Sequence, residues 1–483
     1  MDIVIVGNGI LATSTALRLA MRAGSNDKIK IIGKKARPGS ATLAAAAMLN
    51  SFCEIEEGSL ESDLAMYRFE LSHLATRMWP DFVMEVIKYG GSKLPGGCAK
   101  CQGLCGGCFA LGTYLVNNTA ADCLDDINFK AVVKALDDFD EQYQEVDPRE
   151  IPNYYPEERY RAVRAIYIPN EGWLNPRLTM DAVDSALSSF SCVEFIDEEV
   201  ESIVKEGGEV GHVRLKDGSK ISGDKFMLAT GATATDLLAK SNLGLDIQRI
   251  FYGIGVSIEI NSPQYPHTKC IRTPNRGLAC GLYTVPYFIS HEVPHDSIII
   301  GASNFISPQP MNNGRMVSVA NLMKGAMDQI NKNFFRATIS RINVGWRPTS
   351  SDTYPLLGST SIPNFYVATG TKRDGFHLCP VISEIMCSLI HGDEVDPRFD
   401  AFKPERGPIR DMTREEAIEK AVKHQMSAAY QHGYCPPHSR MNDQMMQMYR
   451  DDLEKLHDQV GAVDWGIPPE MIEMYRYGHI TWD

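Results

Sequence analysis

The spacing of hydrophobic residues at the start of the chain changes from that of a strand to that of a helix. Residues 3–6 form a short apolar, β-branched run that ends at Gly7, and a helix-like apolar pattern continues from Ile10. This order predicts a strand, a tight turn and a helix. The turn has the form G-x-G-x-x-A, in which Gly7, Gly9 and Ala12 occupy the three fixed positions.

Each fixed position of this turn has a physical role in a dinucleotide site. Gly7 permits the turn, Gly9 lets the backbone approach a pyrophosphate, and Ala12 is small enough for the helix to pack on the strand. The helix N-terminus adds free N–H groups and a partial positive charge for the phosphates. A structural glycine turn is the alternative, but the strand before the turn and the helix after it favour a dinucleotide site.

The second predicted strand, residues 28–32, departs from the usual dinucleotide site at its end. An Asp or Glu normally follows such a strand and bonds a ribose hydroxyl, whereas here Gly33, Lys34 and Lys35 follow it. Either the ribose is held through backbone and water, or the two lysines bind a 2′-phosphate, which would indicate NADP. The small residues of 39–49 favour either a tightly packed helix start or a backbone that lies against a phosphate or a flavin ring.

Further along the chain, the pattern predicts alternating helices and strands and then a mainly antiparallel sheet between 246 and 341. That sheet is expected to form a domain inserted into the nucleotide-binding one. The expected helices cover 63–79, 127–139, a stretch from Asn175, and 317–330, and the expected strands cover 110–116, 166–169, 193–196, a hairpin over 199–224, 225–230, 253–260, 282–289 and 297–302.

Length and composition restrict the class of protein. The chain has 483 residues, 44% hydrophobic and 23% charged, as in a soluble globular protein, and its length predicts about three domains. Its net charge of −13 argues against a nucleic-acid partner, whose phosphates would be repelled. No apolar run reaches the length of a membrane span, and the first strand begins at residue 2, which leaves no room for a signal peptide. We therefore expect a cytoplasmic protein with mainly reduced cysteines.

Four cysteines stand close together in a glycine-rich stretch. Cys98, Cys101, Cys105 and Cys108 have the form C-x2-C-x3-C-x2-C. Four thiolates on such a loop are able to hold a tetrahedral zinc ion or an iron–sulfur cluster, although the spacing matches neither usual pattern. Disulfides are the alternative, which a reducing compartment disfavours. We expect a metal site, with zinc ahead of iron–sulfur.

Two later segments complete a pattern that is specific in its order. Residues 345–358 read GWRPTSSDTYPLLG, and residues 365–390 read FYVATGTKRDGFHLCPVISEIMCSLI. Together with the N-terminal turn and with ATGA at 229–232, these segments resemble the FAD-dependent D-amino-acid oxidase superfamily, most closely its glycine oxidase and sarcosine oxidase branch. The resemblance runs to about residue 400 and includes neither the cysteine-rich insertion nor the C-terminal extension.

The pattern and the resemblance together imply an α/β (α+β) two-domain flavoprotein. A Rossmann-like FAD-binding domain would carry an inserted, mainly antiparallel substrate domain and a helical C-terminal extension. The expected divisions are 1–78, 172–245 and 342–402 for the FAD-binding domain, 79–171 and 246–341 for the substrate domain with its cysteine-rich loop 96–108, and 403–483 for the extension.

The resemblance implies that FAD is the cofactor, bound noncovalently because no cysteine lies in 349–357, where some sarcosine oxidases attach it. The implied contacts fall into five groups along the chain. They are Gly7, Gly9, Ile10, Leu11, Ala12, Gly33 and Lys34 for pyrophosphate and ribose; Ala41, Thr42, Ala46, Ala47 and Met48 for phosphate and flavin; Val200 for adenine; Gly231 where a strand returns to the cofactor; and Thr371, Lys372, Arg373, Asp374, Gly375, Phe376 and His377 around the flavin ring.

Four residues are candidates for the substrate side of the site. The resemblance matches Arg347 to the arginine that grips a substrate carboxylate and Arg373 to a second substrate-side position. Arg suits this role because its planar fork forms two bonds with a carboxylate. Satisfaction of backbone carbonyls or of Asp352 is the alternative for Arg347. Tyr283 faces either the substrate or the core, and His377 either tunes the flavin or is a core or surface histidine.

The implied activity is oxidation of the C–N bond of a small amino acid, N-alkyl amino acid or amine that carries a carboxylate. Hydride would move to flavin N5, and O2 would reoxidise the flavin to give hydrogen peroxide. A dehydrogenase subunit that passes electrons to a partner through an iron–sulfur cluster, a non-catalytic assembly protein and an NADPH-using hydroxylase remain alternatives. The apolar faces of the expected helices over 412–429 and 442–460 would pack on the parent domain or on a partner subunit, a lid being a third interpretation. We also expect a homo-oligomer.

Overall fold

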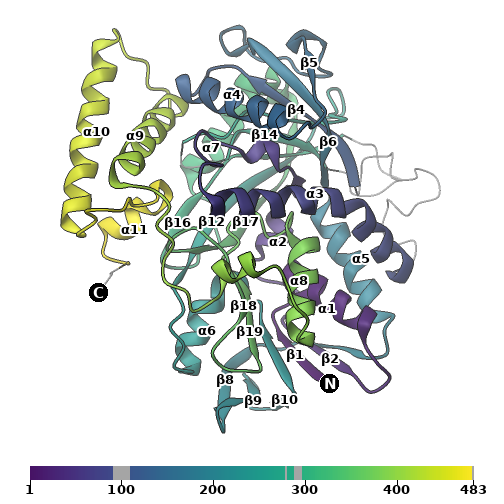
Figure 1. The fold of residues 1–483 in the computed structure, drawn as a ribbon. Helices are drawn as coiled ribbons and strands as arrows, with labels where there is room; N and C mark the ends of the chain where they lie inside the picture. Colours follow the sequence, from purple (N-terminus) through teal and green to yellow (C-terminus); the bar gives the residue numbers. More distant parts are fainter. Residues whose placement is uncertain (91–108, 278–279, 288–295, 481–483) are drawn as a thin grey trace.

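The structure, a computed structural model, describes residues 1–90, 109–277, 280–287 and 296–480. The predicted metal ligands Cys98, Cys101, Cys105 and Cys108 lie outside these residues. Two sheets with their helices form the body of the molecule, and the C-terminal helices lie at one side of it (Figure 1). No helix in the described ranges is both long and apolar enough to cross a bilayer.

The first sheet contains the N-terminal strand and has the order β18-β19-β11-β1-β2-β7. All neighbouring strands run parallel except β18, which is antiparallel to β19. The strands are β1 (Asp2–Val6), β2 (Lys28–Ile32), β7 (Val193–Ile196), β11 (Lys225–Leu228), β18 (Leu356–Ser359) and β19 (Phe365–Thr369).

Alternating side chains of β1 enter two different cores, as the geometry of a strand requires. Ile3 and Ile5 pack against helices on one face of the sheet, whereas Val4 and Val6 face a smaller sheet on the other. The helices on the first face are α1 (Ile10–Arg22), α3 (Asp63–Gly90), α5 (Pro176–Ser188) and α8 (Cys379–His391), and the second face carries α6 (Ala234–Ser241) and the strands β8 (Val200–Glu206), β9 (Glu209–Leu215) and β10 (Lys220–Ser222).

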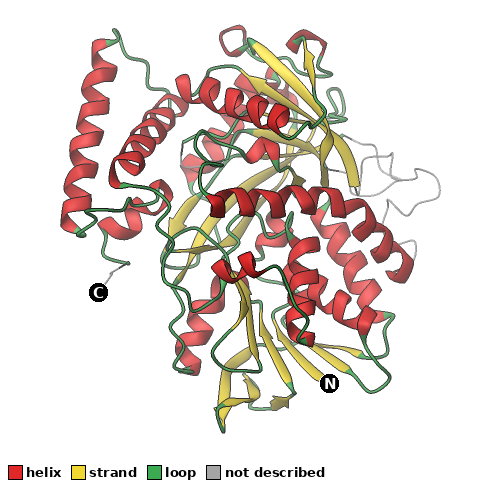
Figure 2. Cartoon of the chain, viewed as in Figure 1, coloured by secondary structure: helices red, strands yellow, loops and turns green. Residues whose placement is uncertain are grey.

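The second sheet is larger and mainly antiparallel, with the order β16-β12-β15-β14-β13-β4-β6-β3 and with β17 paired to β12 and β5 to β6. It curves behind α3 in the view of Figure 2. Its strands are β3 (Met48–Leu49), β4 (Phe109–Asn117), β5 (Gln144–Val146), β6 (Arg164–Leu174), β12 (Ile250–Asn261), β13 (Cys270–Arg272), β14 (Tyr283–Pro286), β15 (Ser297–Gly301), β16 (Phe305–Ser307) and β17 (Thr338–Ser350), accompanied by α2 (Ala41–Ala44), α4 (Cys123–Asp138), α7 (Met316–Gly325) and the 3-10 helix η1 (Phe52–Glu54).

The C-terminal extension packs on this second sheet. Its helices are α9 (Arg414–Gln431), α10 (Arg440–Gln459), the 3-10 turn η10 (Pro469–Met471) and α11 (Ile472–Arg476). They share a hydrophobic core to which β12 contributes the fully buried Phe251. Because Phe251 of β12 is part of this core, packing on the parent domain is confirmed for the extension.

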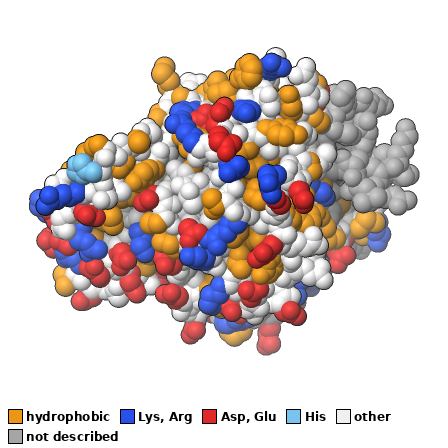
Figure 3. Space-filling model, turned by 90° about the horizontal axis from the view of Figure 1, so that it is seen from above, with side chains coloured by type: hydrophobic (Ala, Val, Ile, Leu, Met, Phe, Trp, Pro, Cys, Tyr) orange, Lys and Arg blue, Asp and Glu red, His pale blue; other side chains and the backbone are white. Residues whose placement is uncertain are grey.

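Charged side chains cover the outside of the molecule. From above, acidic and basic side chains intermix on the surface (Figure 3). Within the extension, Arg450 of α10 pairs with Glu415 of α9 at 2.6 Å.

The predicted fold class is confirmed, and two of the elements that differ in extent cross predicted boundaries. α3 continues beyond the predicted end at 79, through Pro80, to Gly90, because Phe82, Val83 and Val86 are buried beyond the proline. The strand β17 pairs with β12 from Thr338 to Ser350. It therefore crosses the predicted domain boundary at 342, and α3 crosses the one at 78; the division into domains stays a prediction.

Candidate active site

A pocket of about 590 Å³ runs from the carboxyl ends of β1 and β2 to β17. It is lined by every residue predicted to bind the cofactor except Ala12, which is fully buried. The four predicted substrate-side residues, Arg347, Arg373, Tyr283 and His377, line the same pocket. Segments far apart in the sequence therefore meet at one cavity.

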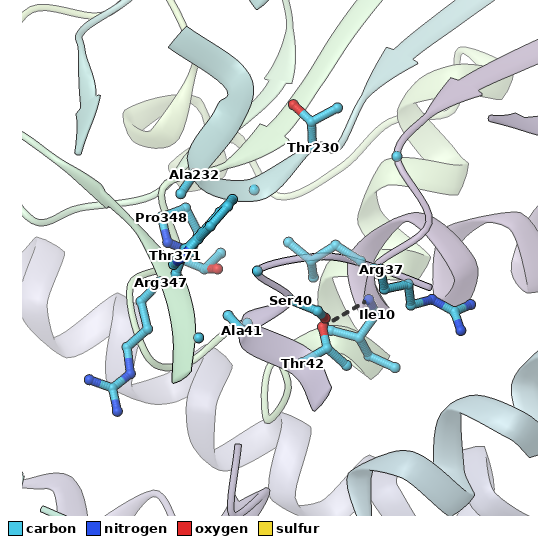
Figure 4. A pocket seen from close by; sticks show the side chains of 18 of the residues that line it. Ile10, Arg37, Ser40, Ala41, Thr42, Thr230, Ala232, Arg347, Pro348 and Thr371 are labelled. Carbon is cyan, nitrogen blue, oxygen red and sulfur yellow. Dashed lines mark hydrogen bonds between the residues drawn. The ribbon is translucent and has the colours of Figure 1, made fainter. Parts of the chain in front are cut away.

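The turn between β1 and α1 forms one wall of the pocket. Gly7 has φ +116°, and a Cβ added there would lie 2.3 Å from the carbonyl oxygen of Ala229. Only glycine therefore fits at this position. At the N-terminus of α1 the Ile10 N–H donates to Thr42 Oγ1 at 3.3 Å (Figure 4), so one of the N–H groups expected to be free is occupied.

A buried hydroxyl without a partner lies beside this part of the pocket. Thr230, two residues after the end of β11, lines the cavity, and its Oγ1 is buried without a hydrogen-bond partner among the described residues. Figure 4 shows it opposite the start of α1. A buried polar atom of this kind usually has a partner, so Thr230 Oγ1 fits a site that holds a polar ligand.

The end of the pocket near β2 explains the missing acidic residue at position 33. The side chain of Asn8 fills the space beside Gly33, where a Cβ would lie 2.7 Å from Asn8 Cγ. Lys34 Nζ lies 3.0 Å from Glu198 Oε2, and both residues line the pocket. Glu198 compensates the charge of Lys34, which weakens the second interpretation, a 2′-phosphate bound by the two lysines.

Arg37 is a pocket residue that the sequence reasoning missed. Its Nη2 lies 2.7 and 2.8 Å from the two carboxylate oxygens of Asp184 on α5, and its Nε donates to the Asn8 carbonyl at 2.8 Å. Burial raises the pKa of Asp184, and Arg37 opposes this shift. Arg37 therefore fixes the turn that contains Asn8 and Gly9.

Two contacts hold the opposite walls of the pocket together. The backbone N–H of Trp346 donates to the Gly39 carbonyl at 3.0 Å. Gly39 has φ +68° and leaves room for the Trp346 ring, because a Cβ at position 39 would lie 2.2 Å from that ring. The Lys372 N–H donates to the Pro348 carbonyl at 2.7 Å. The strand β17 is thus joined both to the loop before α2 and to the segment between β19 and α8.

Arg347 lies in the pocket with half of its guanidinium unpaired. Its Nη1 donates to the Ser303 carbonyl at 2.9 Å and to Asn304 Oδ1 at 3.1 Å. Within the described part of the chain, no carboxylate lies within 4.0 Å of it, and Nε and Nη2 have no acceptor. Asp352, the alternative partner, is bound instead by Arg406. Figure 4 shows Arg347 and Arg37 at opposite sides of the drawn region.

Arg373 lines the pocket, and a carboxylate compensates its charge. Its Nε lies 3.1 Å from Glu54 Oε2, and Glu54 Oε1 lies 2.7 Å from Nη1 of the buried Arg272. Burial opposes the ionisation of Glu54, yet Arg373 and Arg272 lower its pKa. Because Glu54 compensates its charge, Arg373 supports the pocket wall. Glu54 itself was missed, and no local pattern identifies it.

His377 and Tyr283 line the pocket but are almost completely buried. His377 is 6% exposed, its Nε2 lies 2.8 Å from Thr76 Oγ1 on α3, and burial lowers its pKa to about 4. This shift favours the neutral imidazole at neutral pH. Tyr283 lines the pocket but is 5% exposed, and burial raises its pKa.

Comparison with known families gives a match over most of the chain. Residues 2–389 match the family model described as DAO, FAD dependent oxidoreductase. The chain belongs to this family. The predicted family is therefore confirmed, and with it the FAD-dependent oxidoreductase class. The described residues contain no cluster of three or more His, Cys, Asp or Glu able to hold a metal. The four cysteines of the predicted zinc or iron–sulfur site lie outside those residues, and no comparison shows such a site.

Relatives of this DAO-family chain are distant. A bifunctional protein ThiO/ThiG from Nostoc sp. is 23% identical over 413 residues, which are 83% of this chain and 54% of that protein. The chain spans about half of the length of this relative and about a third of three others. The structure of iminodiacetate oxidase from Chelativorans sp. BNC1 superimposes with TM-score 0.68 at 19% identity, covering 84% of this chain and 100% of that one. Glycine oxidase from Bacillus cereus gives TM-score 0.66 at 20% identity, covering 84% and 99%. These two likenesses concern the fold.

Proposed function

We propose that the protein oxidises the C–N bond of a small amino acid or N-alkyl amino acid with a free carboxylate, with noncovalent FAD as electron acceptor. The observation that carries this proposal is the Arg347 guanidinium, whose Nε and Nη2 are open to a ligand in the same pocket as the dinucleotide turn. Similarity in fold to glycine oxidase and iminodiacetate oxidase supports the same class of substrate.

The residues present fit FAD along the whole pocket. The backbone of Gly9 and the N-terminus of α1 offer N–H groups to a pyrophosphate, and the unpaired hydroxyl of Thr230 offers a further polar contact. At the other end, the N-terminus of α8 follows the 371–377 segment and places partial positive charge toward the pocket. No cysteine lies in 349–357, which supports noncovalent binding.

The chain's own residues would bind and orient the substrate. Nε and Nη2 of Arg347 would donate to the two carboxylate oxygens side-on, which sets the direction of the α-C–H bond. Ala46, Met48 and Tyr283 form an apolar wall near this point, and a low local dielectric strengthens such an ion pair. When bound, FAD would supply the two-electron acceptor for the hydride, with O2 as the final oxidant that takes up two electrons and two protons to give hydrogen peroxide. The proton that the amine loses would go to water, and water would hydrolyse the resulting imine.

The test is anaerobic mixing of the purified, FAD-loaded protein with glycine, sarcosine, iminodiacetate and larger amino acids, followed by flavin absorbance. Bleaching by at least one carboxylate-bearing amine, followed by hydrogen peroxide release on admission of air, is the expected result. Acid precipitation should release the flavin into the supernatant. A flavin that no substrate bleaches, or a chain that binds no FAD, would refute the proposal and favour a non-catalytic role. Bleaching that air does not reverse would indicate another electron acceptor.

A further inference from the structure

One side chain of the C-terminal extension reaches the substrate end of the pocket. Glu470, in η10, places Oε1 2.7 Å from Nζ of Lys372, a pocket residue, and the two side chains are 15% and 12% exposed. Glu470 Oε2 accepts from Asn304 Nδ2 at 3.4 Å. The extension therefore contacts the segment that follows β19. It also contacts the loop whose Ser303 and Asn304 accept hydrogen bonds from Arg347.

Asn304 connects Glu470 to Arg347. Its Oδ1 accepts from Arg347 Nη1 at 3.1 Å while its Nδ2 donates to Glu470. An amide has a donor side and an acceptor side, and the two neighbours demand opposite sides. If the amide turned over, its NH2 group would face the guanidinium, donor against donor. The carboxylate of Glu470 thus selects the amide orientation that keeps Arg347 bonded through Nη1.

The same carboxylate compensates a buried cation. Burial lowers the pKa of Lys372, and Glu470 is its ion-pair partner. Burial opposes the ionisation of Glu470, yet Lys372 and Arg373 together lower its pKa. The Lys372 N–H also donates to the carbonyl of Pro348, the residue after Arg347. Glu470 is thereby linked to Arg347 on two sides, through Asn304 and through Lys372.

The position of Glu470 is fixed by the core of the extension. Met471, beside it, is fully buried in the cluster that includes Phe251 of β12. Before it, the Ile467 N–H donates to Nε2 of the buried His457 at 3.1 Å. A well-packed element of this kind holds a charged side chain in one place, which a loose tail does not.

We propose that Glu470 is a positioning residue for carboxylate recognition and that the C-terminal extension is part of the substrate site. This inference rests on the proposed function for the identity of the ligand. Glu470 holds Asn304 and Lys372 so that Nε and Nη2 of Arg347 stay turned to the carboxylate. Glu470→Gln keeps the size of the side chain but presents an NH2 group to Asn304 or to Lys372, so the relay breaks.

The experiment compares Glu470→Gln with Glu473→Gln in the full-length, FAD-loaded protein. Glu473 is a matched control, since it lies three residues on, is 58% exposed and pairs only peripherally with Arg476 at 3.3 Å. We expect KM for a carboxylate substrate to rise about tenfold or more in Glu470→Gln, with kcat and FAD content changed much less, and no change in the control. An equal effect in both variants, or no rise in KM, would overturn the proposal.

Two further measurements keep the outcome decisive. Asn304→Ala removes the same chain of hydrogen bonds without changing a residue of the extension, so it should raise KM similarly. The double variant, Asn304→Ala with Glu470→Gln, should have a KM no higher than either single variant. Additive effects would refute a shared pathway. Where Glu470→Gln folds poorly, Asn304→Ala alone carries the test, and no rise in its KM would refute the proposal. Glycolate has a carboxylate but no nitrogen to oxidise, and its binding is measured by calorimetry. Weaker glycolate binding in Glu470→Gln supports this inference even if no amine bleaches the flavin, a result that would defeat the proposed function alone.

Discussion

Removal of the Arg347 guanidinium should weaken catalysis by a calculable amount. Its Nη1 is engaged by Ser303 and Asn304, so Nε and Nη2 are the donors that Arg347→Ala takes from a substrate carboxylate. Hydrogen bonds to charged groups contribute about 1.5–3 kcal/mol each, so two of them contribute about 3–6 kcal/mol. At 1.4 kcal/mol for each factor of ten, kcat/KM should fall by about 10²–10⁴.

The assay is hydrogen peroxide production against substrate concentration, with FAD content measured from absorbance. Arg341→Ala is the matched control, because Arg341 lies on the same strand, β17, but is exposed and outside the pocket. The control should keep the wild-type kcat/KM, and both variants should keep FAD. A fall of less than tenfold for Arg347→Ala, or an equal fall in the control, would show that Arg347 does not bind the carboxylate.

Three further predictions concern the cofactor, acid stability and the core. Gly7→Ala should prevent retention of FAD during gel filtration, because its Cβ would lie 2.3 Å from the Ala229 carbonyl oxygen; a yellow variant would contradict this. His377, whose pKa burial lowers from 6.5 to about 4, binds its proton more weakly when folded. Its contribution to stability is therefore present above pH 6.5 and is lost as pH falls toward 4, by about 3 kcal/mol, so urea unfolding should show a shallower acid loss in His377→Gln. Arg276→Met should lower the free energy of unfolding by about 3–5 kcal/mol, because it leaves the buried Asp125 carboxylate without its ion-pair partner at 2.8 Å. A loss below about 1 kcal/mol would refute this reasoning.

The sequence identified those parts of the fold and site that depend on local pattern. The strand, turn and helix around Gly7 follow from residues that are neighbours in the chain, and Arg347 stands in a recognisable segment. The pairing of Arg373 with Glu54 was out of reach, because 319 residues separate the two and no periodicity links them. α3 passes through Pro80 for a similar reason, since tertiary burial outweighs the local cost of the proline.

The extension shows the same limit. Its helices were predictable from their apolar period, whereas the contact of Glu470 with Lys372 depends on how those helices pack on the second sheet. Sequence reasoning placed Lys34 and Lys35 as candidates for a phosphate. The structure instead gives Lys34 to Glu198, a partner from the end of another strand.

The contact between Gly39 and Trp346 has a consequence for anyone who wishes to alter this enzyme. The ring and the backbone amide of Trp346 tie the loop beside the proposed dinucleotide site to β17, the strand that carries Arg347. Engineering of substrate range through mutations at or beside Trp346 will therefore alter coenzyme retention at the same time. Libraries that leave both positions fixed and vary the opposite wall should separate the two properties.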